Sequence, residues 1–100
     1  MTEKDLGRVV TTAGIDREIK NNYDFHIFVS ECLVSRYLNE DWGELCEEDK
    51  AMNDSAIKNG DDKIFASYNI SEELSDVGEK IYIITEWDRS VTTILFPEEY

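Results

Sequence analysis

The sequence has little of the chemistry on which most active sites depend. It contains one histidine, one proline and two cysteines among its 100 residues. A nucleophile–base pair usually needs a histidine, and the lone His26 is interpreted as a surface or half-buried helix residue. Cys32 and Cys46 have neither a metal-binding spacing nor the pattern of a disulfide framework, and Cys32, which has apolar neighbours, is predicted to be a buried thiol. The five scattered glycines form no phosphate-binding loop.

These absences predict a protein that is not an enzyme and uses no cofactor or metal. A small enzyme stays open as an alternative, because carboxylates are abundant enough to form a general acid/base pair. Long apolar runs are also missing, and a membrane span needs about 20 such residues. Met1–Gly7 lacks the apolar centre of a signal peptide. We therefore expect a cytoplasmic protein without membrane contact.

Basic residues are few as well. Ten Lys and Arg stand against 23 Asp and Glu, so the net charge is −13. Direct binding to nucleic acid needs cations to neutralise phosphates, and this chain has too few. Self-repulsion at this charge destabilises a compact state. Solubility is one reason for retaining the charge, and attraction to a basic partner surface is the other.

What the sequence does contain is enough apolar material for one core. The hydrophobic fraction is 41%, and 100 residues is the size of a single domain. The domain is predicted to span residues 1–100, with 1–7 frayed at the terminus. Arg8–Thr12 is a β-prone run and is expected to form an edge strand, and Ile15–Lys20 a helical turn.

Two longer helices are predicted from local signals. Asp24–Leu38 carries an apolar stripe at spacings of three and four, made of Phe25, Phe28, Val29, Cys32, Leu33 and Tyr37. The second helix runs from about Glu47 to Asn59. Its first turn is acidic, as the helix dipole favours, and Gly60 follows as a left-handed stop. Its apolar stripe is thin and consists of Leu45, Met52, Ala56 and Ile57.

The second half of the chain is rich in β-prone residues. Lys63–Ile70, Lys80–Glu86 and Val91–Phe96 have the composition and length of strands. Short connections between them favour antiparallel pairing. The fold class is therefore predicted to be α+β, with two to three helices packed on one face of a three-stranded antiparallel meander.

The densest acidic segment surrounds a tryptophan. Six carboxylates lie between positions 40 and 49, and Trp42 lies among them; they are Glu40, Asp41, Glu44, Glu47, Glu48 and Asp49. An aromatic anchor ringed by negative charge is typical of a surface that binds Arg and Lys. The alternative is a solvated helix N-terminus with Trp42 folded onto the core. A second cluster of Glu72, Glu73, Asp76 and Glu79 is either a further contact or a solvated loop.

The predicted turn between the last two strands holds Trp87, Asp88 and Arg89. A Trp and an Arg at an exposed tip are typical of residues that dominate protein interfaces. The alternative is that Trp87 closes the core while Asp88 and Arg89 shape the turn.

These segments carry a resemblance to a known family. The shared pattern consists of Asp41-Trp42-Gly43…Leu45…Glu48-Asp49…Asn53…Ala56…Gly60 and Ile83-Ile84-Thr85-Glu86…Asp88-Arg89-Ser90…Thr92-Thr93-Ile94-Leu95-Phe96-Pro97…Glu99-Tyr100. It resembles small "plasmid-related" proteins that plasmids, phages and other mobile elements of Gram-positive bacteria encode. The likeness covers residues 40–100 well and the first long helix loosely, and it brings no catalytic residues with it.

The resemblance implies a mobile-element origin and a bacterial host cell. Such elements carry small acidic inhibitors of bacterial defence, including anti-CRISPR and antirestriction proteins, several of which imitate the charge of DNA. We therefore expect an inhibitor that covers a basic nucleic-acid-binding surface of a Cas effector or another defence nuclease. The first alternative is an accessory or regulatory module that binds another mobile-element protein without DNA mimicry. A homodimer formed by an edge strand or a helix face would also fit.

Overall fold

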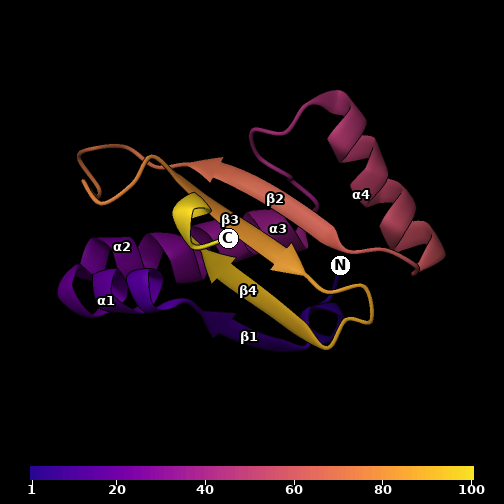
Figure 1. Ribbon diagram of the computed structural model, residues 1–100, viewed down its shortest axis with the longest axis horizontal. Coiled ribbons are helices and arrows are strands. Elements are labelled where there is room, and N and C mark those ends of the chain that lie inside the picture. The colour runs from indigo at the N-terminus through magenta and orange to yellow at the C-terminus, as the bar shows by residue number, and fades with distance from the viewer.

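The computed structural model describes residues 1–100 and contains four strands flanked by helices (Figure 1). The elements in chain order are η1 (Glu3–Leu6), β1 (Arg8–Thr11), α1 (Ala13–Asn21), α2 (Tyr23–Ile27), η2 (Phe28–Leu33), α3 (Val34–Leu38), α4 (Glu47–Asn59), β2 (Ile64–Asn69), β3 (Lys80–Thr85), β4 (Val91–Leu95) and η3 (Pro97–Glu99). The η1 and η3 segments are 3-10 turns, and η2 is a π-helical turn. The α+β class predicted from the sequence is confirmed.

The sheet has the strand order β1-β4-β3-β2. Strands β2, β3 and β4 form the predicted antiparallel meander, in which Phe65 lies opposite Ile84 and Ile84 opposite Thr93. The edge strand predicted at Arg8–Thr12 is confirmed as β1, but the three-stranded sheet was incomplete, because β1 joins it as a fourth strand that runs parallel to β4 with Val10 opposite Thr93. This pairing joins residues more than 80 positions apart, so no local sequence pattern reveals it.

The long helix predicted over Asp24–Leu38 is formed by α2, η2 and α3 in succession. Its buried residues follow one another at intervals of four, namely Phe25, Val29, Leu33 and Tyr37. In a regular helix of 3.6 residues per turn, such a row drifts by about a third of a turn over twelve residues. The wider π turn absorbs part of this drift and keeps the row on the sheet. Cys32 is exposed as a result, so its prediction as a buried thiol was wrong.

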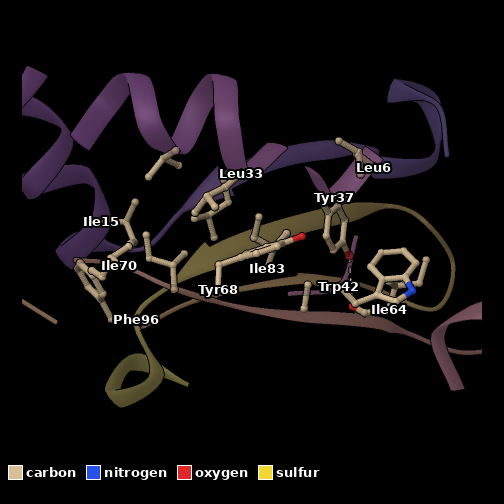
Figure 2. Packing of buried hydrophobic residues seen from close by; sticks show 14 of the residues in the cluster. Leu6, Ile15, Leu33, Tyr37, Trp42, Ile64, Tyr68, Ile70, Ile83 and Phe96 are labelled. Carbon is tan, nitrogen blue, oxygen red and sulfur yellow. Dashed lines mark hydrogen bonds between the residues drawn. The ribbon is translucent and has the colours of Figure 1, made fainter. Parts of the chain in front are cut away.

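The helices α1 to α3 cover one face of the sheet. Along β3, Ile81, Ile83 and Thr85 point into this side and are buried, whereas Tyr82 and Ile84 on the other face are half-buried. Figure 2 shows side chains of the helices and of the sheet meeting in this core. Helix α4 lies beside β2 rather than over the helix-covered face (Figure 1). No helix of the fold combines the length and apolar character needed to cross a bilayer.

The first seven residues are folded, which corrects the prediction of a frayed terminus. The amino group of Met1 donates to the carbonyl oxygen of Leu38 at 3.0 Å and pairs with Glu40 at 3.0 Å. Leu6 is only 4% exposed and belongs to the core. Its carbonyl oxygen accepts a hydrogen bond from the Thr92 hydroxyl at 2.7 Å. These contacts connect the start of the chain to α3 and to β4.

Candidate functional site

The outer edge of β2 is covered by the segment that carries the first acidic cluster. The side-chain amide of Asn53 on α4 donates to the Phe65 carbonyl oxygen at 2.7 Å and accepts from the Phe65 N–H at 3.1 Å. The Ser67 N–H donates to the Trp42 carbonyl oxygen at 3.3 Å, and the Glu44 N–H donates to the Ser67 carbonyl oxygen at 2.6 Å. These bonds satisfy the strand edge and fix the segment against it.

Trp42 does not serve as an exposed anchor. It is 3% exposed, and its ring meets the Tyr37 ring edge-on at a centroid distance of 5.5 Å (Figure 2). Its indole N–H donates to the Asp54 carboxylate at 3.1 Å. The alternative interpretation, in which Trp42 folds onto the core, is therefore the one that the structure shows.

All six carboxylates of the first cluster are exposed, but they differ in whether a cation already engages them. Glu40 pairs with the N-terminal amino group, and Asp41 accepts from Arg36 at 2.7 and 3.4 Å. The hydrogen bond from Arg36 is the main cause that lowers the pKa of Asp41 below its ordinary value. Glu47 lies 3.8 Å from Lys50. The members without an ion pair are Glu44, Glu48 and Asp49.

A hollow of about 290 Å³ opens beside the start of α4. Four of its lining residues are apolar and four are polar or charged, namely Leu45, Met52, Phe65 and Tyr100, and Asp49, Asn53, Asp62 and Lys63. Met52, a member of the thin apolar stripe of α4, is 61% exposed. The Asp49 and Asp62 carboxylates carry no ion pair, and the Lys63 ammonium is directed to the Tyr100 hydroxyl at 3.2 Å.

The hollow was not apparent from the sequence. Its residues come from α4, from the turn before β2, from β2 itself and from the C-terminus, which are separated along the chain. The one available signal was the i, i+3 pair of Asp49 and Met52, which places a charge and an apolar side chain on a single helix face.

The second acidic cluster lies on the connection between β2 and β3. Glu72, Glu73, Asp76 and Glu79 are all exposed and none has an ion pair. Figure 1 places this connection and the segment leading into α4 on the β2–β3 side of the sheet, away from β1. The chain is accordingly polarised in charge. Residues 1–20 hold four basic and four acidic side chains, whereas residues 21–100 hold six basic and nineteen acidic ones.

The turn after β3 holds the predicted tip residues Trp87, Asp88 and Arg89, and their side chains have different environments. Trp87 is 63% exposed and does not close the core. Asp88 accepts from the Ser90 N–H at 3.0 Å and shapes the turn. The Arg89 guanidinium donates to the carbonyl oxygen of Ala56, near the end of α4, at 3.0 Å and to that of Asp62 at 2.7 Å. Arg89 therefore braces the fold, and its role as a partner-binding residue stays a prediction.

The remaining chemistry of the chain is sparse. His26 is half-buried on α2, and its Nδ1 atom is buried without a hydrogen-bond partner. The aromatic ring of Tyr23 lies beside it at a centroid distance of 6.4 Å. No group of three or more His, Cys, Asp or Glu side chains is arranged to hold a metal ion.

Comparison with protein-family models, with curated proteins and with solved structures finds no match to this chain. The resemblance to the plasmid-related proteins therefore stays a prediction. The properties of the site rest on its own residues and geometry.

Proposed function

We propose that the protein is a non-enzymatic inhibitor that binds a basic, nucleic-acid-binding surface of a bacterial defence nuclease complex, and that it acts as an anti-CRISPR protein. The observation that carries this proposal is the set of carboxylates without ion pairs, Glu44, Glu48 and Asp49, of which Asp49 lines the partly apolar hollow. A carboxylate without an ion pair inside the molecule can bind a cation of a partner without first losing an internal contact.

The hollow suits a long basic side chain. Lys and Arg bury their aliphatic stems along apolar surface and keep the charged end in a polar setting. Leu45, Met52 and Phe65 offer the apolar surface, and Asp49 and Asp62 line the same hollow. An Arg or Lys of the partner would place its stem on the first group and its charge beside the second.

The helix geometry also bears on how DNA would be imitated. Duplex DNA carries one charge per about 1.7 Å of its axis. Successive helical residues turn by about 100°, so Glu47, Glu48 and Asp49 fan around the start of α4 instead of forming one row. This favours insertion of the start of α4 into a basic groove over a side-by-side replacement of a length of duplex.

The test combines capture with charge reversal. The tagged protein is used at low salt to retain partners from host cells that carry defence systems, and the retained proteins are identified by mass spectrometry. Binding to the purified effector is then measured for the variant Glu44→Lys/Glu48→Lys/Asp49→Lys. We expect at least a hundredfold loss of affinity and a steep decrease with salt in the wild type.

The matched control places the same charge change elsewhere. The variant Glu31→Lys/Glu86→Lys/Glu98→Lys reverses three exposed carboxylates that lie outside the cluster and have no ion pair. The net charge changes equally in both variants, but these carboxylates lie away from the proposed interface, so we expect only a small loss of affinity. Equal losses in the two variants would show that net charge alone acts. Full inhibition by a folded cluster variant would refute the proposal.

A second function is favoured by the sheet face that the helices leave open. Phe65, Tyr82, Ile84 and Thr93 are half-buried on this face. An accessory module that binds another mobile-element protein through it would show weak salt dependence. Retention of a partner by the cluster variant at high salt would support this alternative.

A further inference from the structure

The two edges of the sheet differ in whether their backbone groups are satisfied. At the β2 edge, Asn53 and the segment around Trp42 and Glu44 take up the outward N–H and C=O groups. At the other edge, the Arg8 N–H donates to the Ser90 carbonyl oxygen and the Thr12 N–H to that of Ile94. Because these bonds alternate along a parallel pair, the main-chain groups of Val9 and Thr11 point away from β4. Figure 1 shows no element beyond β1.

An uncovered edge strand is a template for another strand. Natural edges are usually protected by charge, proline or a bulge, but Val9 and Thr11 are uncharged and β-prone, and Val9 is 47% exposed. The strand is therefore open in both its backbone and its side chains.

The charge around this edge selects the occupant. The acidic side chains of residues 1–20 are matched in number by basic ones, whereas the rest of the chain has a large acidic excess. A second copy of the chain is therefore repelled least at the balanced N-terminal region, which contains β1. The edge is thus the place where two molecules of this acidic protein can approach.

We infer that β1 pairs antiparallel with β1 of a second copy, with the two Val10 residues meeting at the two-fold axis. In this register, Val9 of each copy lies opposite Thr11 of the other, and these two pairs form four main-chain hydrogen bonds. Isologous contact of this kind closes a symmetric dimer. The two four-stranded sheets become one continuous sheet of eight strands.

The register was derived from the backbone hydrogen bonds alone, and it also brings opposite charges together. Arg8 lies opposite Thr12 of the second copy, and the Thr12 hydroxyl donates to the Glu99 carboxylate at 2.6 Å within each chain. Residues directly opposite each other in this way are close in space. Each Arg8 therefore approaches the Glu99 carboxylate of the other copy, which the Thr12 hydroxyl holds in place. The dimer contains two such contacts. The inference does not depend on the proposed inhibitory function.

The test compares two substitutions at one position. Val9→Pro removes the outward N–H, which β4 does not use, and Pro is tolerated on edge strands. Val9→Thr keeps the N–H and nearly the same shape. Sedimentation equilibrium over a wide concentration range should show a dimer for the wild type and Val9→Thr. Val9→Pro should weaken the dimer about 10- to 100-fold, since two of the four hydrogen bonds are lost.

A charge variant and a direct probe complete the experiment. Arg8→Glu should weaken the dimer by roughly tenfold, because two attractive pairs become repulsive. In the wild type, the amides of Val9 and Thr11 should exchange more slowly with solvent as the concentration rises, while exposed amides of the β2–β3 connection should not change. This measurement remains informative if Val9→Pro fails to fold. A wild type that stays monomeric at millimolar concentration, or a folded Val9→Pro that dimerises like the wild type, would overturn the inference.

Discussion

Replacing Thr92 with valine removes the last hydroxyl of a buried chain of three, the one that donates to the backbone. The Thr92 hydroxyl lies 2.8 Å from that of Thr85, which lies 2.7 Å from the hydroxyl of Tyr37. Thr92 donates its single proton to the carbonyl oxygen of Leu6. Thr92 must therefore accept from Thr85, and Thr85 must in turn accept from Tyr37. The chain connects α3, β3, β4 and η1 through the core.

This order of donors predicts a ranking of stability losses. Thr92→Val leaves the Leu6 carbonyl oxygen without its donor and deprives Thr85 of its acceptor. An unsatisfied buried group costs about 1–3 kcal/mol, so we expect a loss of about 2–3 kcal/mol. Thr85→Val forces Tyr37 to use the Ile64 carbonyl oxygen at 3.4 Å, which costs about 1–2 kcal/mol. Tyr37→Phe removes only the terminal donor and costs about 1 kcal/mol.

Thermal and urea unfolding followed by circular dichroism measure these losses. For a domain of this size, 1 kcal/mol corresponds to a shift of about 4–8 °C in Tm, so Thr92→Val should unfold roughly 10–20 °C lower. Thr93→Val is the matched control, since the neighbouring Thr93 is half-buried on the open sheet face. It should change stability by no more than about 0.5 kcal/mol. Equal losses for Thr92→Val and Tyr37→Phe, or a Thr92→Val as stable as the control, would refute the ordered chain.

Three further outcomes follow from single contacts. Arg89→Gly and Arg89→Ala both lose the hydrogen bonds from Arg89 to the backbone near α4. Arg89 also has a left-handed φ of 60°. Because glycine accepts this conformation, Arg89→Gly should be about 1 kcal/mol more stable than Arg89→Ala in urea unfolding. Gly43→Ala should lower Tm far more than Gly60→Ala, since a Cβ at Gly43 overlaps the Ser67 carbonyl oxygen and one at Gly60 meets nothing, although both have positive φ. The hydrogen bond from Arg36 lowers the pKa of Asp41 below 3.8. The ionised Asp41 therefore stabilises the fold above pH 3.8, and this stabilisation is lost as the pH falls through the lowered pKa. The stability of Asp41→Asn should lack this pH-dependent loss when acid unfolding is measured.

Part of the candidate site could be read from the sequence. The acidic residues around positions 40–49 are visible as a run of letters, and their exposure follows from their charge. The sequence does not show which of these carboxylates remain free of an ion pair and so available to a partner. That depends on Arg36 reaching Asp41 across a turn and on the N-terminus reaching Glu40, almost forty residues away. The two tryptophans show the same limit, because Trp42 is in the core and Trp87 is on the surface although both lie in acidic turns.

Local signals along the chain are sufficient to place several of the elements. The bounds of α4 agree with the prediction from its acidic first turn and from Gly60, and the three strands of the meander agree to within one residue at each end. Caps, turn residues and apolar periodicity act over a few positions, so they can be read along the chain. Three features depend on the folded chain: β1 joins β4 in parallel, a π turn exposes Cys32, and Arg89 donates to the backbone near the end of α4. Each of these depends on which distant segments pack together, because a backbone group or a guanidinium acquires its role from the partner that folding brings to it.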